Sequence, residues 1–281
     1  MVVSALRYGA MAFERTLGNI LYGAFEARDD YGVAPVFDLT ALLTLDEWAA
    51  ATRDFSRNYD TTGLSNLIRR SRKEIRVQKR DITDLETLGS LLRSGMPLEA
   101  GMIANALRRS GMAERIRSLA PPAEQVSTQL METLNTLSLT ANVTAKGDIP
   151  LTASELRRQE SLVENAMAQG DLGRALRLAR EYLVNRVLHA QDPDAKWLLW
   201  SRRDQAYVDL RVVAKDRAAS SEAWRSVQAI VEDRNALAHC GHDPDKFDLR
   251  QTAVDLAAAW ESIRDQPDEF FRVPRSARRE N

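Results

Sequence analysis

The chain has 281 residues, with 33 arginines against six lysines and a formal net charge of −1 at pH 7, which argues against strong nonspecific nucleic-acid binding but allows a local groove. No apolar run approaches the ~20 residues of a membrane-spanning helix, and the first residues do not resemble a signal peptide, so we expect a cytoplasmic protein with no membrane contact. A single cysteine, Cys240, excludes an internal disulfide framework, and with only three histidines it makes a Cys/His zinc site unexpected.

Residues 1–58 are the only part of the chain with an α/β pattern. A helix is predicted over Ser4–Arg15, followed by short apolar strands at Ile20–Phe25 and Val36-Phe37 with a turn signal at Asp29–Gly32 between them. Two strands and a helix make too little sheet to be stable alone. We therefore expect this segment to need a partner, either more chain or another subunit.

Residues 59–148 are predicted to form a helical connector. Leucine and isoleucine recur at steps of three and four from Leu64 to Leu92, and Pro121-Pro122 marks a break before another helix. Between Arg69 and Arg80 seven residues are basic and one is acidic. This run is either the solvated face of a connector helix or part of a surface that guides RNA.

Residues 149–281 have a helical pattern throughout. Asn142–Pro150 is the best linker candidate, and Thr152 with Glu155 three residues later has the pattern of a capping box at a helix start. The whole chain is therefore predicted to be mainly α, ending in a helical bundle. The helices of this bundle are expected at about Ala153–Gln169, Leu172–Ala190, Asp194–Val213, Ser221–Ala238 and Leu249–Ile263.

The most suggestive residues lie at the end of the fourth of these helices, in Arg234-Asn-Ala-Leu-Ala-His239. The Arg–His spacing alone carries no weight, because this composition yields about one such pair by chance. The context adds weight. Arg234 continues the apolar stripe that ends at Val231, and a buried arginine must have a partner or a ligand. Asn235 lies four residues before His239, so its amide can reach the imidazole.

Gly241 lies where this helix is expected to end. His239 would then sit at a helix C-terminus, where the helix dipole favours the protonated ring and keeps a general acid available near neutral pH. Such a set suits RNA cleavage without a metal, in which a 2′-hydroxyl attacks the adjacent phosphate. His239 would move protons, and Arg234 would stabilise the charge on the phosphorane. The two side chains point about 140° apart on an ideal helix, so a two-fold dimer is expected to bring two copies together.

Two separate stretches resemble known proteins. Arg234–His239 resembles the Arg-polar-x-x-x-His motif of HEPN ribonucleases, and Ile20–Glu26 with Ala34–Leu39 resembles the distal part of a CARF domain. In this order they resemble the type III CRISPR-associated CARF–HEPN ribonucleases of the DxTHG group, over nearly the whole chain. The Asp-x-Thr-His-Gly motif is absent, as is the first half of a Rossmann-like CARF domain, so we expect an N-terminally truncated member.

The resemblance implies a partial CARF-like segment (1–58), a helical connector (59–148) and a HEPN domain (149–281). It implies a metal-independent endoribonuclease of antiviral defence that cleaves single-stranded RNA as a homodimer when cyclic oligoadenylate binds. Arg234 and His239 would be the catalytic pair, with Asn235 in a supporting role. No cofactor is implied beyond this activator, and no residue here is assigned to binding it.

Two other hypotheses remain open. The chain could be a noncatalytic helical dimerisation module, in which Arg234 and His239 only build an interface, or an inactive truncated remnant that does not fold alone. Arg180 and Glu181 either orient Arg234 or form an ordinary surface ion pair. His189 is expected to have a cap or surface role and His242 to lie in a solvated loop, and nothing marks Cys240 as a nucleophile. Core packing, rather than base stacking, is expected for Trp197, Trp200, Trp224 and Trp260.

Overall fold

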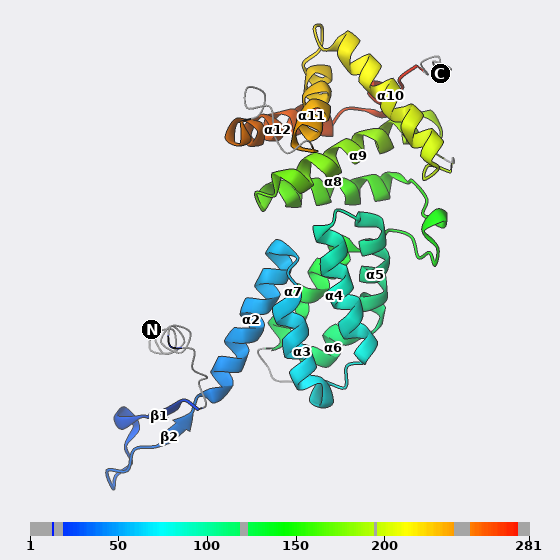
Figure 1. The fold of residues 1–281 in the computed structure, drawn as a ribbon. Coiled ribbons are helices and arrows are strands. Elements are labelled where there is room, and N and C mark those ends of the chain that lie inside the picture. Colours follow the sequence, from blue (N-terminus) through cyan, green and yellow to red (C-terminus); the bar gives the residue numbers. More distant parts are fainter. Residues whose placement is uncertain (1–12, 14–18, 119–122, 194–195, 239–247, 275–281) are drawn as a thin grey trace. The chain divides into compact units, whose positions relative to one another are not determined.

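The structure, a computed structural model, describes residue 13 and residues 19–118, 123–193, 196–238 and 248–274. Within these residues the chain forms eleven α-helices and one two-stranded sheet, which confirms the prediction of a mainly α protein (Figure 1). The chain divides into two compact units that are interleaved in sequence. Unit 1 comprises Met1–Glu86 with Gly111–Met131, and unit 2 comprises Thr87–Ser110 with Glu132–Asn281.

The two predicted strands form an antiparallel hairpin in unit 1. Strands β1 (Leu21–Gly23) and β2 (Val36–Asp38) pair with Tyr22 opposite Phe37. A 3-10 turn, η1 (Phe25–Ala27), follows β1. The turn expected at Asp29–Gly32 also forms, because the Asp29 carboxylate accepts hydrogen bonds from the backbone N–H groups of Tyr31 (3.0 Å) and Val33 (2.9 Å). The helix predicted over Ser4–Arg15 falls outside the described residues, apart from Phe13.

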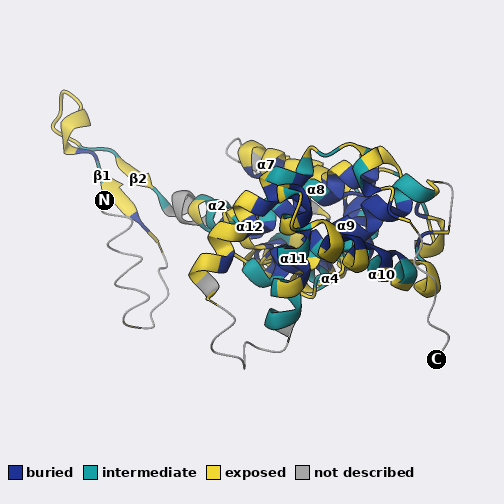
Figure 2. Ribbon diagram, turned by 90° about the horizontal axis from the view of Figure 1, so that it is seen from above, coloured by how far each residue is buried: buried dark blue, intermediate teal, exposed yellow. Residues whose placement is uncertain are grey.

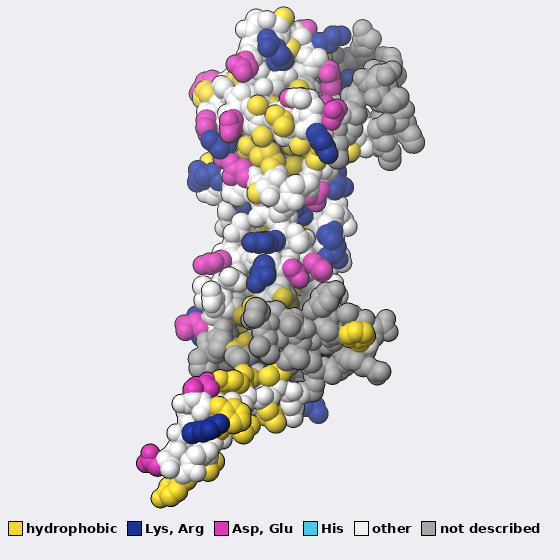
Figure 3. All heavy atoms as spheres, turned by 90° about the vertical axis from the view of Figure 1, so that its left-hand side faces the viewer, with side chains coloured by type: hydrophobic (Ala, Val, Ile, Leu, Met, Phe, Trp, Pro, Cys, Tyr) yellow, Lys and Arg dark blue, Asp and Glu magenta, His cyan; other side chains and the backbone are white. Residues whose placement is uncertain are grey.

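The two strands of the hairpin keep their apolar side chains on the surface, whereas Ile20 and Ala24, which flank β1, are buried. Figure 3 shows hydrophobic side chains over the hairpin, and the exposed fractions reach 64% for Leu21 and 66% for Val36. A two-stranded ribbon with both faces exposed is marginal in water. This exposure agrees with the expectation that the segment needs a partner.

The rest of unit 1 is helical. Helix α2 packs against α3 and ends at Asn58. The capping residue Tyr59 has a left-handed backbone (φ +56°), which ends the helix, and its N–H donates to the carbonyl of Phe55 at 2.9 Å. Phe55, Leu64, Ile68 and Ile116 are fully buried. The helices of this unit are α2 (Thr40–Asn58), α3 (Thr62–Ile75), α6 (Met112–Arg117), and parts of α4 (Lys79–Arg93) and α7 (Ala123–Leu137).

Unit 2 contains the predicted C-terminal helices. Helix α8 lies along α9, and α11 contacts α9, α10 and α12; a terminal 3-10 turn, η3, returns to α9 (Figure 1). Buried residues, dark blue in Figure 2, run along α9 at the centre of this unit. The elements are α5 (Pro97–Arg109), η2 (Lys146–Asp148), α8 (Ala153–Ala168), α9 (Leu172–Gln191), α10 (Trp200–Arg217), α11 (Glu222–Ala238), α12 (Leu249–Arg264) and η3 (Asp268–Phe271).

Helix α5 belongs to this C-terminal core although it precedes residue 149. Leu98 and Leu139 are buried in the same hydrophobic cluster as the helices from α8 to α12, and the Asn105 amide donates to the carbonyls of Leu139 and Ala141, both at 3.3 Å. Ile149, in the predicted linker, is 3% exposed. The two compact units therefore do not divide at residue 148, the boundary expected from the sequence. Residues on both sides of that position belong to one hydrophobic core.

Of two predicted helix starts in unit 2, the structure confirms one and moves the other. Thr152 caps α8 as predicted, its Oγ1 accepting from the N–H of Glu155 at 3.1 Å. Helix α10, expected from about Asp194, begins only at Trp200. The preceding Trp197 is buried, with Nε1 donating to the carbonyl of Ile149 at 2.6 Å. This contact holds the chain in a loop before the helix can start.

Gly101 of α5 provides a test of this packing. A Cβ at this position would lie 2.9 Å from Cγ of Leu139 and 3.2 Å from the carbonyl oxygen of Leu137. Overpacking costs about 1–3 kcal/mol, against about 1 kcal/mol gained when alanine replaces a helical glycine. We expect Gly101→Ala to lower the free energy of unfolding, measured in urea. Gly147→Ala is the control, because nothing lies within 4 Å of its Cβ position; equal effects would contradict the packing.

Candidate functional site

The motif helix α11 carries Arg234 and Asn235 near its C-terminal end. Trp224, Val227 and Ile230 of this helix are buried in the core of unit 2, which fixes the orientation of the helix. Arg234 and Asn235 are half-buried. His239, the expected second catalytic residue, lies outside the described residues, as do Cys240, Gly241 and His242.

The side chains of Arg234 and Asn235 contact each other and reach a tyrosine of α10. Arg234 Nη1 donates to Asn235 Oδ1 at 3.3 Å, and Asn235 Nδ2 donates to the hydroxyl of Tyr207 at 3.4 Å. The sequence predicted His239 as the partner of the Asn235 amide. In the described residues this amide links Arg234 to the neighbouring helix. Its contact with His239, which lies outside these residues, stays a prediction.

Tyr207 in turn lies between two arginines. The guanidinium of Arg180 is 4.1 Å from the centre of the Tyr207 ring, and that of Arg211 is 5.6 Å away. A cation over an aromatic face is favourable by about 0.5–1 kcal/mol at exposed sites. Three helices of unit 2 thus contribute to one connected set, which we call the Tyr207 cluster: Arg180, Tyr207, Arg211, Arg234 and Asn235.

Glu181 connects this cluster to a further arginine. Its two carboxylate oxygens each form an ion pair, one with Arg180 and the other with Arg203. The sequence left two roles open for Arg180 and Glu181; the structure shows the ion pair, and a role in orienting Arg234 stays a prediction. The pair is partly exposed, and Arg180 also reaches Arg234 indirectly, through Tyr207 and Asn235.

A cleft of about 160 Å³ opens beside the cluster. Its lining includes Arg180, Arg203, Tyr207 and Trp200. Trp197, Trp224 and Trp260 are buried as predicted, but the same prediction is wrong for Trp200, which is 77% exposed. Helical spacing misassigned this residue because it is the first of α10, before the buried face of the helix begins.

Other candidate residues lie apart from this set. His189 Nδ1 is 3.4 Å from Oδ2 of Asp268 in η3, and Arg186 of α9 donates to Oδ1 of the same residue at 3.2 Å. Of the basic run Arg69–Arg80, three arginines form ion pairs with acidic side chains: Arg69 with Glu86, Arg70 with Glu47, and Arg80 with Asp84. These pairs neutralise part of the run. Its two interpretations remain open.

Asp233, next to Arg234 on the motif helix, has a carboxyl group whose pKa is shifted. Burial raises its pKa above the ordinary value, and the negative charges of Asp255 and Glu232 raise it further. Below the ordinary pKa of about 3.9 the carboxyl is protonated in both folded and unfolded chains. As the pH rises through the raised folded pKa, the free energy of unfolding falls, because the unfolded chain has already released its proton.

We therefore expect Asp233→Asn to stabilise the protein at pH 7 and to lose this advantage near pH 4. Urea titrations at the two pH values measure the difference. Glu261→Gln, at an exposed position of α12, controls for the loss of one negative charge, because Glu261 is not among the groups that raise the pKa of Asp233. A gain that is equal at both pH values would contradict the raised pKa.

Among the described residues, no three His, Cys, Asp or Glu side chains gather closely enough to hold a metal ion. None of the described helices combines the length and the apolar character needed to cross a membrane. No protein-family model and no curated protein matches this sequence.

Proposed function

We propose that this chain is a HEPN-type endoribonuclease of type III CRISPR antiviral defence, which cleaves single-stranded RNA without a metal. The observation that carries the proposal is the environment of Arg234. Its guanidinium is linked through Asn235 and Tyr207 to Arg180. Arg180 and Tyr207 line a cleft together with the exposed Trp200, Arg203 and the acidic Glu181 and Asp204. Arginine binds phosphate through a planar fork, and exposed aromatic rings stack on unpaired bases.

The proposed reaction begins when the 2′-hydroxyl of the RNA attacks the adjacent phosphate and the 5′-oxygen of the next nucleotide leaves. His239 moves the protons, and Arg234 stabilises the charge that develops on the phosphorane. Asn235 supports Arg234, since its Oδ1 accepts from Nη1 of that arginine. Tyr207 holds the Asn235 amide from α10 and is a positioning residue.

Regulation follows from the resemblance and belongs to the same proposal. Cyclic oligoadenylate would bind a CARF domain to which the hairpin of β1 and β2 contributes, and a homodimer would bring two Arg234–His239 motifs together. The exposed apolar residues of this hairpin, such as Leu21 and Val36, support its packing against further protein.

One observation favours the alternative of a noncatalytic dimerisation module. Val208 and Val212 lie one turn apart on α10 and are 40% and 45% exposed, and Leu199 and Trp200 at the start of the helix are also exposed. An apolar strip of this kind is typical of a contact between protein chains. In this alternative the Tyr207 cluster only shapes the edge of the interface.

The deciding experiment incubates the full chain with single-stranded RNA in EDTA, with and without cyclic tetra-adenylate or hexa-adenylate. The proposal predicts cleavage by the wild type, products ending in a 2′,3′-cyclic phosphate, and no cleavage by an Arg234→Ala/His239→Ala variant. If the wild type cuts no better than this variant in any condition, the proposal fails.

Analytical ultracentrifugation of the same two proteins tests the alternative, which predicts that the double variant loses dimerisation and has no activity to lose. An inactive remnant predicts no cooperative thermal unfolding transition for the wild type.

A further inference from the structure

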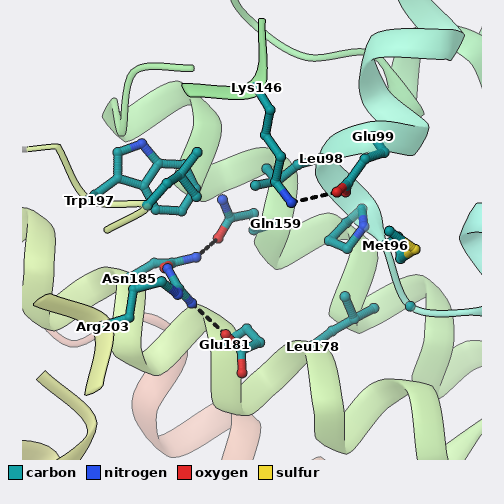
Figure 4. Close-up of a pocket in the computed structure, with 13 residues that line it drawn as sticks. Met96, Leu98, Glu99, Lys146, Gln159, Leu178, Glu181, Asn185, Trp197 and Arg203 are labelled. Carbon is teal, nitrogen blue, oxygen red and sulfur yellow. Dashed lines mark hydrogen bonds and ion pairs between the residues drawn. The ribbon is translucent and has the colours of Figure 1, made fainter. Parts of the chain in front are cut away.

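Unit 2 encloses a second and larger cavity, of about 330 Å³ (Figure 4). Its walls come from the start of α5, the turn η2, helices α8 and α9, and the segment leading into α10. A volume of about 300–1,000 Å³ is typical of small-molecule sites. The side chains of its walls determine which kind of ligand it can bind.

One wall is formed by two buried amides, Gln159 and Asn185, which are 7% and 4% exposed. Asn185 Nδ2 donates to Gln159 Oε1 at 2.6 Å, and Asn185 Oδ1 accepts from Arg203 Nη1 at 2.7 Å. Gln159 Nε2 donates to Glu155 Oε1 at 3.0 Å. Arginine can only donate and a carboxylate can only accept, so the two ends fix the orientation of both amides.

This orientation decides what the wall offers to a ligand. Each amide nitrogen has two N–H groups and uses one of them in the chain of hydrogen bonds from Arg203 to Glu155. The second N–H of each amide is left for a further acceptor. The wall therefore selects a molecule with hydrogen-bond acceptors along one edge.

The charges around the cavity cancel. Lys146 pairs with Glu99, and Arg203 pairs with Glu181, as the dashed lines in Figure 4 mark. A phosphate or carboxylate would have to displace one of these carboxylates from its cation. Because two cations and two anions line the space, a neutral ligand fits better than an anion.

The remaining walls are apolar and partly flat. Figure 4 shows Trp197 and Leu178 on different sides of the cavity, with Met96 and Leu98 also lining it. The indole of Trp197 is held in place, because its Nε1 donates to the carbonyl of Ile149 at 2.6 Å. A fixed aromatic ring in a cavity that aliphatic side chains also line suits a planar ligand. The guanidinium of Arg203 lies 5.6 Å from the centre of the same ring.

We propose that this cavity binds a nucleobase, that is, a neutral heteroaromatic ring whose edge accepts hydrogen bonds from Gln159 and Asn185. The base could belong to a free nucleoside or to an RNA strand. The proposal does not depend on ribonuclease activity. Arg203 and Glu181 line both this cavity and the cleft beside Tyr207, so the two spaces share part of one wall.

Isothermal titration calorimetry of the full chain with adenosine, guanosine, cytidine and uridine tests the proposal. At least one nucleoside should bind the wild type. Leu178→Trp should fill the cavity and weaken this binding at least about tenfold, or about 1.4 kcal/mol. Leu172→Trp is the matched control, on the same helix, half-buried and away from the cavity, and should bind as the wild type does. Met96→Trp fills the cavity from a more exposed position, should weaken binding in the same way, and replaces Leu178→Trp if that variant does not fold.

Competition with a single-stranded RNA decamer identifies the source of the base. If the RNA displaces the nucleoside and also binds Leu178→Trp more weakly, the strand supplies the base. If the RNA does neither, the ligand is a free nucleoside. The proposal is overturned if no nucleoside binds the wild type, if both cavity-filling variants bind as the wild type does, or if the 5′-monophosphates bind more tightly than the nucleosides. Arg234→Ala should leave nucleoside binding unchanged, which separates this result from the fate of the ribonuclease proposal.

Discussion

Replacing Arg234 by alanine is expected to lower RNA cleavage about 100- to 1,000-fold, the loss typical when one fixed donor to a developing oxyanion is removed. Lysine at this position keeps the positive charge but loses the planar fork that binds two phosphate oxygens. Arg234→Lys should therefore retain only part of the activity. Single-turnover rates on a fluorescent RNA measure both variants.

The same substitution should barely change the stability of the fold. Arg234 is half-buried, and its hydrogen bond to Asn235 is a long one at 3.3 Å, so we expect a loss below about 1 kcal/mol. Arg225→Ala is the matched control, an exposed arginine of the same helix, and should cleave as the wild type does. Equal cleavage rates for the two alanine variants would show that Arg234 has no part in the reaction.

Replacing Glu155 by glutamine is expected to cost about 3–5 kcal/mol of unfolding free energy, the penalty of leaving one member of a buried ion pair without its partner. The side chains of Glu155 and Arg158 are 0% and 4% exposed. Arg158 donates to both carboxylate oxygens, at 2.9 and 2.7 Å, and also to the carbonyl of Leu137 at 3.0 Å. In this way it ties the ends of α7 and α8 together.

Urea unfolding at pH 7 checks the Glu155 variant. Glu164→Gln, on the same helix, is the control, because its ion pair with Arg264 is partly exposed (41% and 36%) and should be worth less than about 1 kcal/mol. A second arm replaces the pair by Glu155→Leu with Arg158→Met, which should recover part of the loss because no charge remains buried. If Glu155→Gln and Glu164→Gln are equally stable, the pair contributes nothing.

Local patterns in the sequence predicted the elements well and the contacts between them less well. The hairpin, the cap at Thr152 and the helices of unit 2 depend on residues within a few positions of one another. The capping box at Thr152 shows the limit of prediction from local sequence patterns. Thr152 accepts the N–H of Glu155 as predicted, but the Glu155 carboxylate turns to Arg158 and Gln159 in the core.

The candidate site shows the same limit. The sequence identifies Arg234 and Asn235 through spacing and helix position, because both lie on one helix. Tyr207 and Trp200 could not be found in this way, since their roles depend on how α10 lies against α9 and α11. The spacing of apolar residues in the sequence does not distinguish an exposed tryptophan from a buried one. That distinction also requires the residue at which the helix starts.

The interleaved course of the chain has a consequence for how the protein folds during synthesis. The core of unit 2 contains Leu98, near the start of α5, and Phe271, in the last described turn. These residues emerge from the ribosome far apart in time, so unit 2 cannot close until almost the whole chain has been made. Contacts between such distant residues slow folding. A fragment of residues 149–281 would lack Leu98 and Leu139, and we expect it to expose part of its core and to aggregate.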